Sequence, residues 1–132
     1  MVGSNLLSTG VVIGTRLPAY ATSSGLAMMA MLPEPEAKRL LKASELKAFT
    51  PNTVYEPAKI MERLKQARTK GYVLSVGDYF PNDISLGAAI MSRRGHVQGA
   101  VSLSVAIDRY AAKDAEAKFA RLVSTAAKSI LV

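Results

Sequence analysis

The sequence predicts an α+β domain in which helices pack on an antiparallel sheet. Two runs of alternating side chains, 84–92 and 97–105, enclose the turn-forming residues 93–96 and predict a β-hairpin. Amphipathic helical patterns lie between residues 22 and 71, before the hairpin, and again over 112–131, after it. Helices placed before and after a twisted antiparallel sheet are typical of this fold class.

The composition indicates one folded domain. The chain has 132 residues, of which 49% are hydrophobic, which is enough for a substantial core. It contains no cysteine, which excludes disulfide bonds and thiolate metal sites and is consistent with a cytoplasmic protein. No apolar run reaches the length of about 18 residues that spans a membrane, so we expect no membrane partner.

The formal net charge is +7, which can indicate a nucleic-acid partner or an anionic ligand. The basic residues are spread along the predicted helices, where they alternate with Glu and Asp. This distribution is typical of solvated helix faces. The charge therefore does not by itself predict that this chain binds nucleic acid.

The stretch 14–30 predicts a forced turn followed by a capped helix. The apolar run 11–13 before it predicts a short buried strand, and Pro18 then interrupts regular structure. Three hydroxyl residues at 22–24 precede a helical stripe, so we expect a capped helix over about 22–31. The free N–H groups of its first turn, together with the helix dipole, form a weak anion site. The alternative is a capped helix that binds nothing.

The next two helices are expected at 34–43 and 57–70. Pro35 and Pro57 suit the first turn of each helix, and Gly71 is placed to end the second. The positions expected to be buried are Ala37, Leu40 and Leu41 in the first helix and Ile60, Leu64 and Ala67 in the second.

Residues 72–76 predict a further strand, and the hairpin predicts the pairing of the two strands that follow it in sequence. The expected pairs are Ser85–Ser104, Gly87–Ser102 and Ala89–Ala100 on one face, and Leu86–Leu103 and Ala88–Val101 on the other. One face is therefore bulky and apolar, and the other is small and carries hydroxyl groups. The small face indicates either a pocket for a small polar ligand or a helix packed tightly on small residues.

Catalytic and metal-binding arrangements are not evident in the sequence. His96 is the only histidine and lies in the predicted turn, so a serine nucleophile has no evident base. The loop carboxylates Asp78 and Asp83 are nonspecific, and no phosphate-cradling or dinucleotide motif points to a cofactor. We therefore expect binding rather than catalysis. Arg16 is a candidate cation for an acidic ligand, the alternative being an ordinary surface arginine.

Several short motifs resemble one known family. Residues 14–18, Gly-Thr-Arg-Leu-Pro, followed by Ala21-Thr22, Gly25 and Met29-Ala30, resemble the signature of the effector-binding domain of IclR-type transcription regulators. Further matches in the same order are Phe49-Thr50-Pro51-Asn52-Thr53, Gly71-Tyr72, Gly95 with Val97, and Val101-Ser102-Leu103-Ser104-Val105. The segment 16–20, with Ser104-Val105, is most similar to the subgroup that regulates aromatic-acid catabolism, as in the protocatechuate and 4-hydroxybenzoate pathways.

This resemblance implies a GAF-like, or profilin-like, antiparallel sheet with helices packed on its faces, and residues 1–132 would form an IclR-type effector-binding domain. The first part of that domain and the helix-turn-helix domain of the family have no counterpart in the sequence, so we expect a fragment. The resemblance further implies a homodimer or tetramer, a small organic acid as effector, and DNA binding only through the missing domain. A ligand-free dimerisation or interaction module on the same fold is the alternative.

The resemblance also implies a set of ligand-binding residues. Carried over by motif, they are Leu17, Ser23, Ser24, Ser75, Ser85, Ser102 and Ser104. We expect the effector in a cavity between the helix 22–31 and the small sheet face. Its carboxylate would meet the N–H groups from Ser23 to Gly25, with Ser102 and Ser104 donating hydrogen bonds from inside the cavity.

Overall fold

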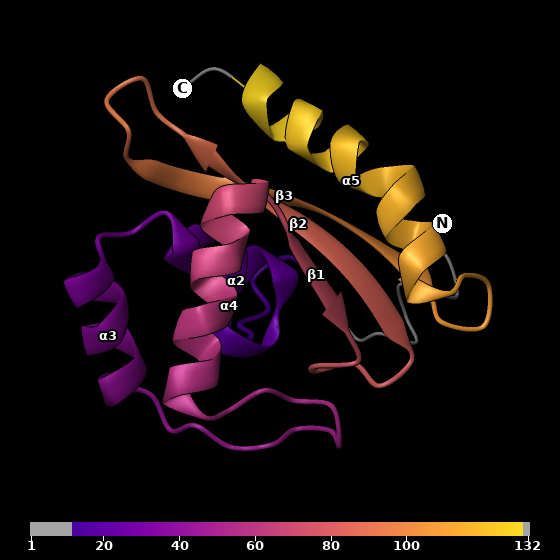
Figure 1. The fold of residues 1–132 in the computed structure, drawn as a ribbon, viewed down its shortest axis with the longest axis horizontal. Coiled ribbons are helices and arrows are strands. Elements are labelled where there is room, and N and C mark those ends of the chain that lie inside the picture. The colour runs from indigo at the N-terminus through magenta and orange to yellow at the C-terminus, as the bar shows by residue number, and fades with distance from the viewer. Residues whose placement is uncertain (1–11, 131–132) are drawn as a thin grey trace.

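The computed structural model describes residues 12–130. The elements in chain order are η1 (Ala19–Ala21), α2 (Ser23–Ala30), α3 (Glu34–Ala43), α4 (Pro57–Lys70), β1 (Val73–Val76), β2 (Asp83–Met91), β3 (Val97–Ala106) and α5 (Ala112–Ser129). The strands form an antiparallel sheet in the order β1-β2-β3. Figure 1 shows α5 along one face of this sheet and the layer of α2, α3 and α4 on the other side. The predicted α+β class is confirmed.

The hairpin has the predicted register. Every pair expected between the two runs is present, including Ser85 with Ser104 and Gly87 with Ser102. Gly95 has φ +81°, which a residue without a Cβ adopts at little cost in a tight turn. A shift in register occurs between Ile90 and Met91, next to the turn. The alternation of side chains thus predicted the faces of both strands correctly.

The bulky face of the hairpin packs under α5. Leu86 and Ala88 are buried against Val123 and Ala127, and Leu103 packs at the margin of this cluster. The phenol of Tyr72 also reaches α5, where its hydroxyl donates to Glu116 Oε2 at 2.7 Å. This hydrogen bond, with a smaller effect of burial, raises the pKa of Tyr72 to about 12.

A second apolar cluster lies between α2, α3 and α4. Leu26 and Ile60 are fully buried there, with Leu41 and Leu64 packed beside them. Arg68 of α4 donates to the carbonyl oxygens of Ala30 at 2.8 Å and Leu32 at 2.7 Å, at the C-terminal end of α2. Because those carbonyls have no partner within the helix, the guanidinium fixes the end of α2 against α4.

Two predictions of buried residues are wrong. Val12 is 65% exposed and Ile13 lies fully exposed in a turn with Gly14, so no buried strand forms at 12–13. An apolar run becomes a strand only where another strand pairs with it, and the sheet does not include this segment. Leu40 is 43% exposed, because only the narrow stripe of Ala37 and Leu41 faces the core. Residues 1–11, which include Val11 of that run, lie outside the described residues.

At Gly87, α2 packs directly against the small face of the sheet. A Cβ added to Gly87 would lie 2.7 Å from the backbone carbonyl of Ser23, closer than side chains approach backbone. The first turn of α2 therefore lies directly on β2, and only glycine fits between them.

Substituting Gly87 tests this contact. Gly87→Ala is expected to lower the free energy of unfolding by about 1–3 kcal/mol, because α2 must shift to admit the methyl group. The matched control is Gly99→Ala on β3, where the new Cβ would find its nearest neighbour at 3.9 Å and should cost less than about 0.5 kcal/mol. Urea unfolding of both variants measures the difference. Equal stability of the two variants would show that α2 does not rest on β2.

Candidate functional site

Three serines form a row across the sheet. Ser75 of β1 pairs with Ser85 of β2, which pairs with Ser104 of β3. Directly paired residues point to the same face, so the three hydroxyl groups lie on one side of the sheet. Ser102 is the next residue of β3 on that side, opposite Gly87. We call the face formed by Ser75, Ser85, Ser102 and Ser104 the serine face.

The first turn of α2 covers the middle of the serine face. Ser23 is 2% exposed, and its Oγ lies 2.5 Å from Ser85 Oγ. Thr22 caps the helix, since its Oγ1 accepts a hydrogen bond from the Gly25 amide at 3.1 Å. A Cβ on Gly25 would lie 2.3 Å from the Ala19 oxygen, so η1 and α2 are also in close contact. The predicted capped helix is confirmed. Above Gly87 this helix packs tightly on the small residues of the sheet and leaves no pocket there.

The outer part of the serine face is open. Ser102 and Ser104 are exposed on β3, an outer strand of the sheet, although α2 packs against both β2 and β3. The enclosed cavity expected over these two serines is therefore absent from residues 12–130. The structure instead presents an open strip, formed by Ser102 and Ser104 on β3 and bordered on one side by the N-terminus of α2.

The remaining predicted site residues lie on the approach to α2. Ser24 and Leu17 are half-buried, and Arg16 is exposed. Both Arg16 and Leu17 belong to the irregular segment before η1, which leads into the capped helix. They flank the helix that borders the strip, and the guanidinium of Arg16 is accessible to solvent.

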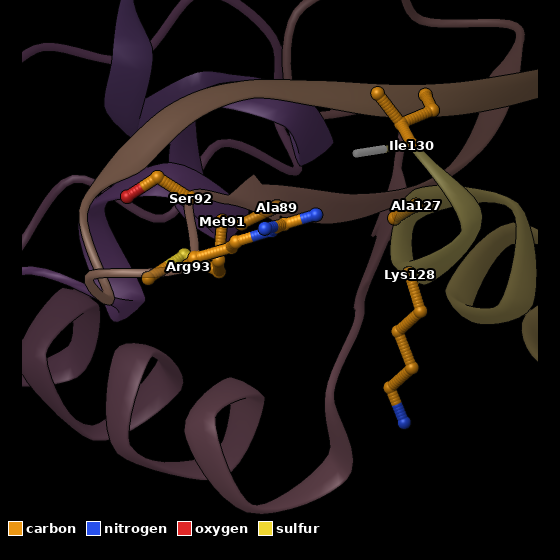
Figure 2. Close-up of a pocket in the computed structure, with 7 residues that line it drawn as sticks. All are labelled: Ala89, Met91, Ser92, Arg93, Ala127, Lys128 and Ile130. Atoms are coloured by element: carbon orange, nitrogen blue, oxygen red, sulfur yellow. The ribbon is translucent and has the colours of Figure 1, made fainter. Parts of the chain in front are cut away.

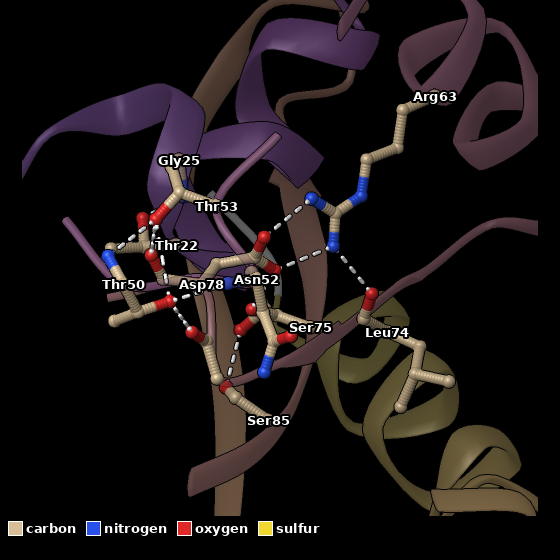
Figure 3. A network of polar contacts seen from close by, with 12 residues as sticks. Thr22, Gly25, Thr50, Asn52, Thr53, Arg63, Leu74, Ser75, Asp78 and Ser85 are labelled. Carbon is tan, nitrogen blue, oxygen red and sulfur yellow. Dashed lines mark hydrogen bonds and ion pairs between the residues drawn. The ribbon is translucent and has the colours of Figure 1, made fainter. Parts of the chain in front are cut away.

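The hydroxyl of Ser75 belongs to a buried ionic network. Ser75 Oγ donates to Asp78 Oδ2 at 2.5 Å, and Asp78 is only 3% exposed. Arg63 of α4 donates to both carboxylate oxygens of Asp78, at 3.2 and 2.8 Å, and to the Leu74 carbonyl oxygen at 2.8 Å (Figure 3). Ser75 is thus linked through Asp78 to the guanidinium of Arg63. Its neighbour Asp78, which the sequence marked only as a loop carboxylate, fastens β1 to α4.

Two threonines hold the loop between β1 and β2 from the other side. Thr53 Oγ1 donates to the Asp78 carbonyl oxygen at 2.6 Å and accepts from the Thr50 amide at 2.9 Å. Thr50 in turn donates its hydroxyl hydrogen to the carbonyl oxygen of Gly77 (Figure 3). Both side chains are buried. The motif Phe49–Thr53 therefore has a structural role, which is to fix the loop that sets the position of the serine row.

Asp83 also lies on the serine face, a position that sequence reasoning did not assign to it. It is half-buried at the start of β2, two residues before Ser85, and therefore points to the serine face. Burial raises the pKa of its carboxyl above the ordinary value, and a hydrogen bond with the Ser104 hydroxyl opposes part of that rise. Extending the alternation at 84–92 by one residue toward the N-terminus would have placed it on this face.

Two cavities lie away from the serine face. One of about 240 Å³ lies between the hairpin and the end of α5, where Arg93 and Lys128 line it (Figure 2). The other, of about 630 Å³, lies between α3 and α4 and is lined in part by Leu41 and Met61. Neither contains a residue of the predicted site.

In the part of the chain that the structure describes, no group of three or more His, Cys, Asp or Glu side chains gathers to hold a metal ion. None of the described helices has the length and apolar character needed to cross a membrane.

A sheet with a hydroxyl-bearing face beneath a capped helix defines an α+β domain with a candidate small-molecule site. Residues 1–132 match the family model described as bacterial transcriptional regulator IclR C-terminal. The chain belongs to this family. The assignment made from the short motifs of the sequence is thereby confirmed.

The relatives are regulators of transcription. The chain is 30% identical over 127 residues to the transcriptional repressor IclR of Escherichia coli, covering 96% of this chain and 46% of the relative. It is 26% identical over 125 residues to the Pca regulon regulatory protein of Pseudomonas putida, covering 95% and 43%. The chain thus spans less than half the length of these curated relatives.

A solved structure shares the fold. The crystal structure of an IclR homolog complexed with 4-hydroxybenzoate, from Microbacterium hydrocarbonoxydans, superposes with a TM-score of 0.74 at 26% identity. The match covers 89% of this chain and 46% of that chain. The α+β fold described above is therefore that of a solved member of the family.

Removing the cation of the buried network should destabilise the fold. Arg63→Ala leaves the carboxylate of Asp78 buried without its partner, and we expect a loss of about 3 kcal/mol in the free energy of unfolding. Lys59→Ala on the same helix breaks only an exposed pair with Glu56 and should cost less than about 1 kcal/mol. Chemical denaturation measures both. A loss from Arg63→Ala no larger than that of the control would contradict a structural role for the network.

Proposed function

We propose that this chain is the ligand-sensing domain of a DNA-binding transcription regulator and that its ligand is a small organic acid, aromatic acids included. The observation that carries the proposal is the open strip of Ser102 and Ser104 on β3, beside the first turn of α2, where Ser23 contacts Ser85. DNA would be bound by a helix-turn-helix domain outside this chain. The protein would act in the cytoplasm as a homodimer or tetramer.

The chemistry of the strip suits a carboxylate. The first turn of a helix presents N–H groups and the positive end of its dipole, which favour an anion near Ser23 and Ser24. The Gly25 amide, which was expected to contribute, already donates to Thr22 Oγ1. The exposed hydroxyls of Ser102 and Ser104 can donate further hydrogen bonds from the sheet. In this arrangement Arg16 supplies a positive charge at the approach and Leu17 an apolar surface for the rest of the ligand.

The names of two relatives support an aromatic acid. One is the Pca regulon regulatory protein, and the other is an IclR homolog whose structure contains 4-hydroxybenzoate. These facts concern those proteins. For this chain they favour an aromatic acid as ligand. They also favour the subgroup that regulates aromatic-acid catabolism, which segment 16–20 resembles.

A ligand on this strip can act on transcription by shifting an equilibrium between two arrangements of paired domains. It must bind one arrangement more tightly than the other, because equal affinity shifts no population. A ligand that contacts α2 can produce this difference in affinity, because α2 also packs against α4 and a shift of α2 would be passed on to that helix.

A ligand-free dimerisation or interaction module is the second candidate. The observation that favours it is the direct contact of Ser23 with Ser85 and of α2 with Gly87, which leaves no enclosed space over β2. In that case the exposed strip on β3 would face another protein surface rather than a small molecule.

Thermal unfolding with a panel of organic acids separates the two candidates. A ligand that binds only the folded chain raises the melting temperature, so the sensing proposal predicts an increase with at least one acid. Calorimetry with that acid should then show a loss of about tenfold or more in affinity for Ser104→Leu, because a hydrogen bond and the space beside it are removed.

The matched control is Thr125→Leu, an exposed hydroxyl-to-leucine change on α5 at the other face of the sheet, which should bind like wild type. Undiminished binding by Ser104→Leu would reject the serine face as the site. A panel in which no acid raises the melting temperature would favour the interaction module.

A further inference from the structure

Asp83 occupies one end of the face on which we place the ligand. It pairs with Ala106 and lies two residues before Ser85 on β2, so both side chains point to the same side. The Ser104 hydroxyl on the neighbouring strand offsets part of the effect of burial on the pKa of its carboxyl. Asp83 is half-buried, and its carboxyl is thus partly withdrawn from water.

No ion pair within residues 12–130 includes this carboxylate. The pairs present join Lys38 to Glu34, Lys59 to Glu56 and Arg63 to Asp78. A partly desolvated carboxylate without a cation gains from any hydrogen-bond donor that comes near, and it repels a second carboxylate. The elevated pKa of Asp83 agrees with this incomplete compensation.

We propose that Asp83 makes the site select organic acids that carry a hydrogen-bond donor, a hydroxyl or an ammonium group, at the end remote from the carboxylate. The inference rests on the proposed function, because it assigns the far end of the same ligand. The hydroxyl or ammonium group of such a ligand would donate a hydrogen bond to the Asp83 carboxylate in place of water. A ligand that lacks this group would cover the carboxylate without giving it a hydrogen-bond donor.

The spacing along β3 fits such a ligand. Ser102, which pairs with Gly87, and Ala106, which pairs with Asp83, are four residues apart on an extended strand, which is about 13 Å. A ring acid held by its carboxylate at the first turn of α2 can extend along the strands toward Asp83. A dicarboxylic acid in the same position would bring two negative charges together and is disfavoured.

Calorimetry with matched acids tests the inference. One pair is 4-hydroxybenzoate and benzoate, and the other is 4-hydroxyphenylacetate and phenylacetate. We expect wild type to bind the hydroxylated member of a pair about tenfold more tightly, because a hydrogen bond to a charged acceptor is lost with the hydroxyl. In Asp83→Ala this preference should disappear. In Asp83→Asn it should shrink while the unhydroxylated acid binds at least as tightly as before.

The matched control is Asp108→Ala, which removes an exposed carboxylate from the segment before α5 and should keep the wild-type preference. Circular dichroism verifies that each variant is folded. If Asp83→Ala does not fold, Asp83→Asn alone provides the test. Equal affinities within each pair in wild type, or a preference that survives both Asp83 substitutions, would overturn donor selection and leave acid sensing intact. If none of these acids binds wild type, donor selection is overturned, whereas the proposed function fails only if the wider panel of organic acids also leaves the melting temperature unchanged.

Discussion

The contact between the first turn of α2 and β2 is the constraint on which the candidate site depends. Gly87 has no room for a Cβ beneath Ser23, and the Ser23 hydroxyl reaches Ser85. This contact sets the height of the helix above the sheet and brings its N-terminus to the border of the exposed strip on β3. Arg68 fixes the other end of α2 against α4, so the helix is held at both ends.

Local patterns in the sequence predicted the part of the fold that depends on neighbouring residues. The turn at 93–96 fixed the register of the hairpin, and a fixed register determines which side chains share a face. Thr22 and Gly71 marked helix ends by their own hydrogen bonding and conformation, which need no distant partner. The serine row across β2 and β3 could therefore be foreseen without coordinates.

Features that depend on distant parts of the chain could not be foreseen in the same way. The apolar run that includes Ile13 was expected to be buried, but local hydrophobicity does not say whether a pairing strand exists. The ion pair of Arg63 with Asp78 joins α4 to the loop after β1, and no local pattern in either segment predicts this pairing. Whether the serine face is enclosed depends on how closely α2 covers each strand, and Ser102 and Ser104 proved exposed although α2 packs against both β2 and β3.

The most direct measurement of the central claim is a crystal structure of the chain grown with 4-hydroxybenzoate. The account predicts density for the acid on the strip of β3, with its carboxylate within hydrogen-bond distance of the Ser102 or Ser104 hydroxyl and next to the first turn of α2. Density for the acid only in the cavity between α3 and α4, or a serine face covered by another protein surface with no acid present, would contradict it.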